Sequence, residues 1–384
     1  MRQQLGSVLV ALAVACGAIG VLLHSPARPG RADAGRQPTG PVPERPAAPP
    51  LAAPAAAASP PIAAPGAEAP PPSEAALGQL LVLDVADPAR VAALAARPAH
   101  LGLLQGIAVA GDRAYLVDYE GGLGVFDVAD PTRPIVVAAA RVPKQARAVV
   151  GGGGYAYVAA GYGGLRVFDL RDPARPAEVA SYRPAGYVQG LALAGGYAYV
   201  AVGPGGLHVL DVADPARPVL VGQVALPGYA FGVALAGHYA YVTAGYAGLR
   251  VVDVRDPARP TEVNALLVPG YVRAVAAARG YAYLADFEAG VRILDLADPA
   301  APLEVAVHGL PGHTFGLALA GRYAYVADGA CGLRILDVSD PRQPTPVGTY
   351  TDQATVMDVA VAERQAYVVA MPPNPLVDCA DDAP

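Results

Sequence analysis

The stretch 239–268, YAYVTAGYAGLRVVDVRDPARPTEVNALLV, contains most of one structural unit and decides the fold class. Residues 239–243 are aromatic and β-branched, residues 249–254 alternate in polarity, and residues 261–268 follow the turn DPARP. A short apolar run, 231–236 (FGVALA), precedes them. Glycine and proline turns separate these runs, so the stretch predicts four short antiparallel strands.

This unit recurs along the chain, with an Asp-Pro pair marking each copy. The spacing between successive pairs is 43 residues once and 42 residues five times, and the pairs begin at Asp87, Asp130, Asp172, Asp214, Asp256, Asp298 and Asp340. An Ala-Tyr pair recurs in the same phase, at Tyr115, Tyr157, Tyr199, Tyr241, Tyr283, Tyr325 and Tyr367. Four strands in a repeat of this length are typical of a propeller blade. A two-helix repeat is excluded because no segment runs ten residues with helical periodicity and without Gly or Pro. The sequence therefore predicts an all-β, seven-bladed β-propeller.

The phase of the repeat predicts how the ring closes. The first recognisable piece, which starts at Leu80 (LLVLDVADPARVAALAA), contains only the third and fourth strands of a unit. The last piece, which ends at Ala370 (TVMDVAVAERQAYVVA), contains only the first and second strands. We expect the two pieces to form one composite blade, because this pairs strand edges that would otherwise be free.

The repeated strings resemble the LVIVD-repeat family over roughly residues 80 to 370. The matching strings are LLVLDVADP, LGVFDVADP, LRVFDLRDP, LHVLDVADP, LRVVDVRDP, VRILDLADP and LRILDVSDP. The resemblance implies a β-propeller on exported bacterial or archaeal proteins. It implies no common biochemical activity.

Composition argues against nucleic-acid binding. The net charge is −6, and the 27 basic residues include one lysine, Lys144, and form no block. Displacing counterions from a phosphate backbone needs clustered basic side chains. Hydrophobic residues make up 54% and charged residues 16% of the chain, which is enough apolar material for a large core.

The first 78 residues predict export and a spacer. Residues 5–23 carry no charge, so residues 1–24 fit either a cleaved signal peptide, with Ala32-Asp33-Ala34 as a candidate cleavage site, or a retained anchor; acylation of Cys16 is a third alternative. Residues 25–78 are rich in Pro and Ala, a composition that favours an extended, unfolded stalk. The propeller is expected over 79–371 and a tail over 372–384, with membrane contact only through the N-terminal segment.

The residues repeated in every blade are interpreted as structural. Each Asp of an Asp-Pro pair, and the Asp three positions before it, can accept hydrogen bonds from turn amides. An Arg three residues after the Asp-Pro aspartate in five units, such as Arg90, can pair with either carboxylate. The Ala-Tyr tyrosines are expected to pack between blades. A ligand site needs side chains that the other blades lack.

Such side chains gather in the loops that precede the first strand and in those that join the second and third strands. Both loop sets are expected on one face of the ring, opposite the Asp-Pro turns. Aromatic residues with a few charges are typical of recognition surfaces. The candidate binding residues are Tyr119, Glu120, Arg147, Tyr162, Tyr187, Tyr229, Phe231, Tyr246, Tyr271, Arg273, Phe287, Glu288, His313 and Phe315. The alternative is that these aromatic residues only fill the mouth of the ring.

Two further predictions concern the same face. Cys331 lies in one of its loops, and the tail can bring Cys379 to it, so we predict a disulfide in an oxidising compartment. Asp118, Asp286 and Asp328 are the metal-ligand candidates of an alternative, metal-assisted hydrolase. Otherwise the sequence has no GxSxG, no phosphate loop and no metal-ligand spacing among its histidines, which we interpret as mostly lying in solvated turns. No cofactor is expected.

These observations favour a non-catalytic, exported interaction module at the cell surface or in the periplasm, with a protein or a glycan as partner. The alternatives are the hydrolase and a purely structural envelope protein.

Overall fold

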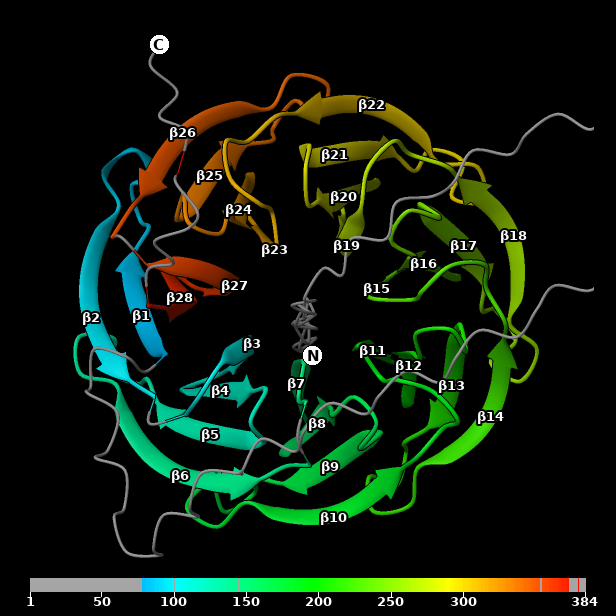
Figure 1. Ribbon diagram of the computed structural model, residues 1–384, viewed down its shortest axis with the longest axis horizontal. Coiled ribbons are helices and arrows are strands. Elements are labelled where there is room, and N and C mark those ends of the chain that lie inside the picture. Colours follow the sequence, from blue (N-terminus) through cyan, green and yellow to red (C-terminus); the bar gives the residue numbers. More distant parts are fainter. Residues whose placement is uncertain (1–77, 100, 144, 353, 373–378, 380–384) are drawn as a thin grey trace, which may run out of the picture. The chain divides into compact units, whose positions relative to one another are not determined.

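A computed structural model describes residues 78–99, 101–143, 145–352, 354–372 and 379. Figure 1 shows seven four-stranded antiparallel sheets arranged as a ring around a central axis. The seven-bladed β-propeller is confirmed. One 3₁₀ turn, η2 (Pro88–Arg90), interrupts the strands. The predicted leader (1–24) lies outside the described residues, as do the predicted stalk (25–78) except for residue 78 and the predicted tail (372–384) except for residues 372 and 379.

Four strands make each blade, in order from the axis outward. Blade 1 comprises β3 (Leu104–Ala110), β4 (Arg113–Asp118), β5 (Gly122–Asp127) and β6 (Ile135–Arg141). Blade 2 comprises β7 (Ala148–Gly152), β8 (Tyr155–Ala159), β9 (Leu165–Asp169) and β10 (Ala177–Tyr182). Blade 3 comprises β11 (Gly190–Ala194), β12 (Tyr197–Ala201), β13 (Leu207–Asp211) and β14 (Val219–Val224).

The other blades follow the same plan. Blade 4 comprises β15 (Val233–Ala236), β16 (Tyr239–Thr243), β17 (Leu249–Asp253) and β18 (Thr261–Leu266). Blade 5 comprises β19 (Val272–Ala278), β20 (Tyr281–Asp286), β21 (Gly290–Asp295) and β22 (Leu303–His308). Blade 6 comprises β23 (Gly316–Ala320), β24 (Tyr323–Ala327), β25 (Leu333–Asp337) and β26 (Thr345–Tyr350).

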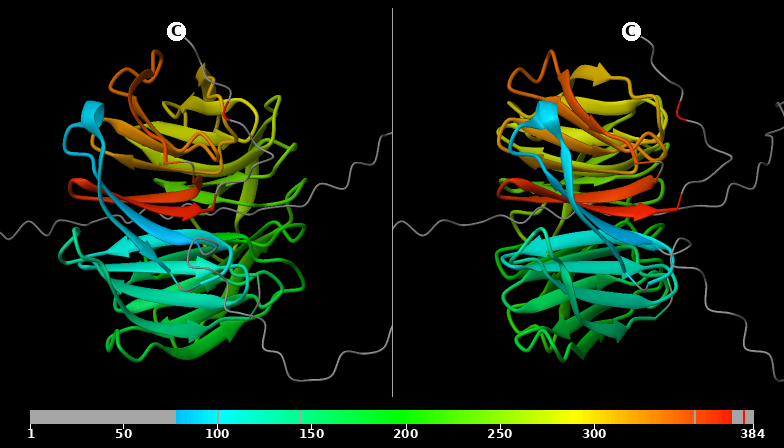
Figure 2. Two further views of the ribbon diagram at one scale, coloured as in Figure 1. Left: turned by 60° about the vertical axis from the view of Figure 1, so that its left-hand side comes forward. Right: turned by 90° about the vertical axis from the view of Figure 1, so that its left-hand side faces the viewer.

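The closing blade combines the two ends of the propeller. Its strand order is β27 (Thr355–Ala362), β28 (Gln365–Met371), β1 (Gln79–Asp84) and β2 (Ala92–Pro98) from the axis outward. In the antiparallel pairing of β1 with β28, Leu81 lies opposite Val368. Figure 2 shows the blue N-terminal strands beside the red C-terminal strands. The predicted composite blade, with inner strands from the C-terminal end, is confirmed.

The core lies between blades, because each sheet is covered on both faces. In β1, Leu80 and Val82 pack into the cluster shared with blade 1, whereas Leu81 and Leu83 pack into the cluster shared with blade 6. All four leucine and valine side chains are at most 1% exposed. Strands buried on both faces need apolar residues at successive positions, which explains runs such as LLVLDV.

The repeated aspartates and tyrosines have the predicted structural roles. Asp84 accepts a hydrogen bond from the Ala86 amide (2.9 Å), and Asp87 accepts one from the Ala89 amide (3.2 Å). Equivalent bonds occur in the other six blades. The seven Ala-Tyr tyrosines are all at most 7% exposed. The Tyr241 hydroxyl donates to the Pro299 carbonyl in the Asp-Pro turn of the next blade (2.9 Å).

Close approach between blade 6 and the closing blade leads to a first prediction. A Cβ added at Gly348 in β26 would collide with the carbonyl oxygen of Pro88 in η2. Gly348→Ala is therefore expected to lower the free energy of unfolding by about 1–3 kcal/mol, as overpacking does. Urea denaturation measures it. Gly309→Ala is the matched control, because no atom lies within 4 Å of its added Cβ; equal stability of both variants would contradict the contact.

No helix of the described residues is long and apolar enough to cross a membrane.

Candidate functional site

The upper face is defined here by the loops that precede the first strand of each blade and those that join its second and third strands; the lower face carries the Asp-Pro turns. Isolated β-bridges link the upper loops of neighbouring blades, at Gly161–Val188, Gly203–Ala230, Gly245–Val272 and Gly329–Val356. The two loop sets therefore lie together, as predicted.

Glycine in these loops makes room for aromatic rings of the next blade. Gly161 and Gly203 have φ of 54° and 50°, and a Cβ at either position would lie 2.8 Å from the ring of Tyr187 or Tyr229, respectively. A residue with a side chain rarely adopts this φ. Three tyrosines, Tyr187, Tyr229 and Tyr271, thus pack over glycine backbone on the upper face.

The resulting aromatic arc, as we name it, spans blades 2 to 6. It consists of Tyr162, Tyr187, Tyr229, Phe231, Tyr246, Tyr271, Phe287, His313 and Phe315. Tyr162 stands edge-on to Tyr187, and Tyr246 edge-on to Tyr271, both with ring centroids 4.8 Å apart. Burial raises the pKa of Tyr271 to about 12, so its hydroxyl stays protonated at physiological pH.

The two arginines predicted for this site are buried among the rings. Arg147 is 5% exposed; its Nε donates to the Tyr187 hydroxyl (2.9 Å), and a terminal nitrogen donates to Oε1 of Gln105 (3.1 Å). Its guanidinium also lies 4.7 Å from the centre of the Tyr119 ring. Arg273 is 3% exposed and lies 5.0 Å from the centre of the Phe315 ring. Both cations therefore stabilise the arc from within.

Exposure separates the candidate residues into two groups. Tyr162 and Tyr246 are 75% and 73% exposed, and Glu120, Glu288 and His313 are also exposed. Tyr187 and Phe231 are buried with the two arginines, and Tyr119, Tyr229, Tyr271, Phe287 and Phe315 are half-buried. Tyr162 and Tyr246 are therefore open to solvent, and the buried Tyr187 supports Tyr162 from below.

The three metal-ligand candidates lie in separate blades, and each holds its own loops. Asp118 accepts hydrogen bonds from the amides of Gly121 (2.6 Å), Gly122 (2.9 Å) and Gly102 (2.9 Å). Asp286 is bonded to the Arg292 guanidinium (2.6 Å). These contacts occupy the carboxylate oxygens that a metal would need.

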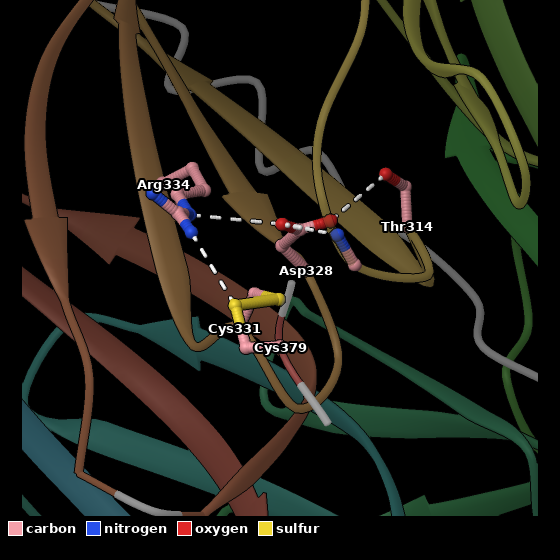
Figure 3. Close-up of a disulfide and its surroundings, with 6 residues drawn as sticks. Thr314, Asp328, Cys331, Arg334 and Cys379 are labelled. Atoms are coloured by element: carbon pink, nitrogen blue, oxygen red, sulfur yellow. Dashed lines mark hydrogen bonds and ion pairs between the residues drawn. A yellow bond between two sulfur atoms is a disulfide. The ribbon is translucent and has the colours of Figure 1, made fainter. Parts of the chain in front are cut away.

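Asp328 and the disulfide lie together on blade 6 (Figure 3). Asp328 accepts from the Gly312 amide (3.1 Å) and lies 3.6 Å from Nε of Arg334. Cys331 and Cys379 are joined by a disulfide, with Cα atoms 5.0 Å apart. Among the residues that the structure describes, no group of three or more His, Cys, Asp or Glu could hold a metal ion.

Two buried ionisable residues were not found from the sequence. Asp358 in β27 is fully buried; its carboxyl accepts hydrogen bonds from the amides of Ile107 (3.1 Å) and Val359 (2.9 Å). Burial raises the pKa of Asp358 well above its usual value, against the effect of these amides. His208 lies in β13 and is 8% exposed, so it is not among the histidines that lie in solvated turns. Comparing equivalent positions would have found both, since other blades have Gly or Ala in place of Asp358.

A separate hollow of about 480 Å³ opens on the lower face, between blade 1 and the closing blade. Small apolar residues of the inner strands, such as Ala108 and Ala360, form much of its wall, and Asp112, Glu363 and Tyr367 complete it. It contains none of the candidate binding residues.

Comparison with known proteins identifies the family. The LVIVD repeat model matches residues 102–140, 143–183, 185–225, 227–267, 269–307 and 311–352, so the chain belongs to the LVIVD-repeat family. No curated protein matches it.

Solved structures support the fold alone. The computationally designed Ika8 protein is similar with a TM-score of 0.53 and 10% identity, over 71% of this chain and 94% of Ika8. Apo AztD from Citrobacter koseri is similar with a TM-score of 0.50 and 15% identity, over 76% of this chain and 88% of AztD.

Proposed function

We propose that this protein is an exported interaction module that binds a partner protein or glycan through the upper face of its propeller. The binding surface is the aromatic arc, and the exposed tyrosines Tyr162 and Tyr246 make the first contact. The protein acts without catalysis, at the cell surface or in the periplasm.

The pair of exposed tyrosines carries this proposal. Each packs edge-on against a second tyrosine, which itself lies over glycine backbone. This contact restricts the rotation of the exposed ring before a partner binds. Rigid tyrosines supply large contact area at low entropic cost, and they are enriched among the residues that dominate binding energy. The exposed carboxylates of Glu120 and Glu288 lie in the loops of blades 1 and 5 and add polar groups to the face.

Export is supported by two independent features. The uncharged run at residues 5–23 fits a signal peptide or an anchor. The Cys331–Cys379 disulfide fits an oxidising compartment, because cytosolic proteins rarely keep disulfides.

The hydrolase alternative lacks support from the site. Asp118, Asp286 and Asp328 each hold loops of a different blade, and their oxygens are bonded to amides or arginines. A purely structural envelope protein would have no dedicated partner. An experiment that captures a bound partner therefore distinguishes the structural role from the proposed binding role.

Site-specific photo-crosslinking in intact cells tests the proposal. A photoreactive amino acid in place of Glu120 on the upper face is expected to give a defined adduct, whereas the same amino acid in place of Asp256 on the lower face is not. When Tyr162→Ala and Tyr246→Ala are added to the Glu120 variant, the yield of the adduct is expected to fall more than about tenfold. A tyrosine that dominates the binding energy of an interface contributes about 2 kcal/mol or more. Protease or glycosidase digestion of the adduct identifies a protein or a glycan.

Ile135→Ala with Leu303→Ala is the matched control, because these side chains are 58% and 67% exposed but lie on outer strands. The control is expected to leave the adduct unchanged. Equal adducts from both faces, or an adduct that survives loss of both tyrosines, would contradict the proposal. No adduct at all would favour the structural role.

A further inference from the structure

Blade 3 lacks an ion pair that both of its neighbours, blades 2 and 4, share with blade 5. In blades 2, 4 and 5, an arginine on the third strand pairs with a glutamate twelve residues later on the fourth strand, at 2.7 Å for Arg166–Glu178, 3.3 Å for Arg250–Glu262 and 3.0 Å for Arg292–Glu304. In blade 3 the two positions are His208 and Leu220. Blade 3 therefore has neither the cation nor the carboxylate.

The missing arginine leaves space. In blade 2, Nε of Arg166 donates to the Gly163 carbonyl (2.9 Å), so the side chain crosses the loop before its strand. The equivalent glycine in blade 3, Gly205, lines an open hollow of about 430 Å³. Its other walls are Tyr182, Arg183, Pro184, Ala185, His208, Gln223 and Ala225. Ligand sites begin at about 300 Å³, so the hollow can take a small molecule or the end of a chain.

His208 lines this hollow and is hydrogen-bonded to a second lining residue. Its Nδ1 lies 2.8 Å from the Tyr182 hydroxyl. Burial lowers the pKa of His208 and raises that of Tyr182, so both side chains are neutral at physiological pH. When the Tyr182 hydroxyl donates to Nδ1, the ring proton lies on Nε2, which is then a hydrogen-bond donor.

The polar side chains around the hollow indicate which ligand chemistry would fit it. Arg183 is exposed, and it is the only formally charged side chain among the lining residues. Gln223 adds an amide, and Pro184 and Ala185 add apolar surface. A guanidinium, an imidazole N–H and an amide together suit a carboxylate, whose two oxygens accept several hydrogen bonds.

We propose that the hollow between blades 2 and 3 is a binding site for a small organic carboxylate. Arg183 supplies the charge, His208 Nε2 and the Gln223 amide donate hydrogen bonds, and the Pro184 wall contacts the apolar part of the ligand. The carboxylate belongs either to a chain terminus or to an acidic sugar. This site is separate from the aromatic arc and does not depend on the proposed partner.

The test uses the full chain with its disulfide and NMR of the backbone amides of Gly205 and Ala225. Titration with N-acetylalanine, a mimic of a peptide terminus, and with glucuronate, an acidic sugar, is expected to give saturable shifts with at least one of them. The expected dissociation constant is on the order of 1 mM, equivalent to about 4 kcal/mol. The ligand that binds more tightly identifies the source of the carboxylate.

A variant that restores the shared ion pair is the critical comparison. His208→Arg with Leu220→Glu gives blade 3 the Arg–Glu pair of blade 2, so the fold is expected to stay intact while the arginine fills the hollow. The saturable shifts are expected to weaken more than about tenfold, a loss of about 1.4 kcal/mol. Arg183→Gln keeps the hollow and removes the charge, and is expected to weaken binding as well.

Two results would overturn the proposal as a whole, and a third would overturn the role of Arg183. One is the absence of saturable shifts with either ligand up to about 100 mM, because the dissociation constant would then be about a hundredfold above the expected value. The other is unchanged binding in the restored variant, because the ligand would then lie elsewhere. The third result is a salt dependence of binding that is the same in the wild type and in Arg183→Gln. The charge that salt screens would then not be the charge of Arg183.

Discussion

Removing residues 354–384 is expected to abolish cooperative unfolding of the propeller. The deletion takes away β27 and β28, which are the inner half of the closing blade, and leaves β1 and β2 without their partner strand. It also exposes core residues such as Leu81, Leu104 and Ile335 at two blade interfaces. Each fully exposed Leu or Ile costs about 1.5–3 kcal/mol, and several of them exceed a total stability of about 5–15 kcal/mol.

Circular dichroism during urea denaturation measures this loss, and a circular permutant provides the control. Gln79 in β1 pairs with Ala370 in β28, so a short linker can join residue 371 to residue 79. A chain that starts at β3 and ends with β2 then contains every strand in a complete set of blades. We expect this permutant to unfold cooperatively, with a stability lower than that of the intact propeller by about 2–4 kcal/mol, because it lacks Cys379 and therefore the disulfide. A deleted chain that kept a sharp transition would contradict ring closure as the source of stability.

The second large effect is a pH dependence due to Asp358. An unfolded aspartate has a pKa of about 3.9, and burial raises the pKa of Asp358 in the fold. Between these two values the folded protein holds a proton that the unfolded chain has lost. The contribution of Asp358 is therefore fully present below about pH 4, and it declines by up to about 1.4 kcal/mol per pH unit until the folded pKa is passed.

Asp358→Ala isolates this contribution. Near pH 4 the variant is expected to be less stable than the wild type by about 1–3 kcal/mol, because the buried Ile107 amide loses its acceptor. The difference is expected to shrink or reverse as the pH rises toward 8. Urea denaturation across this pH range measures it, with the exposed Asp112→Ala as control. A difference that does not change with pH would show that Asp358 titrates as an ordinary aspartate.

Sequence patterns were sufficient for the fold because the same chemistry recurs in every blade. Asp-Pro turns, Ala-Tyr pairs and apolar strand runs repeat in one phase, and each repeat is a local signal of the same structure. The composite blade also followed from the phase, since the incomplete first and last copies add up to one unit. The strand bounds predicted for residues 231–268 agree with the structure to within two residues, and the disulfide joins Cys331 to its predicted partner.

The candidate site was harder to predict because burial depends on contacts between blades. Arg147 and Arg273 look like exposed charges in the sequence, but rings from neighbouring blades surround them. The carboxylates of Asp118 and Asp286 look like metal ligands, but loop amides and Arg292 occupy them. His208 was missed because its importance lies in the absence of the arginine that blades 2, 4 and 5 carry at the equivalent position, and only a comparison of equivalent positions reveals that absence.

The composite blade also sets the order in which the protein can mature. Of the propeller strands, β1 and β2 are synthesised first, whereas β28, which pairs with the other edge of β1, is synthesised last. Until β28 is synthesised, one edge of β1 therefore stays unpaired, a state that favours aggregation. A chaperone that binds nascent chains would cover the unpaired edge of β1 until β28 is synthesised. Premature termination anywhere before β28 would release a chain that cannot complete the closing blade.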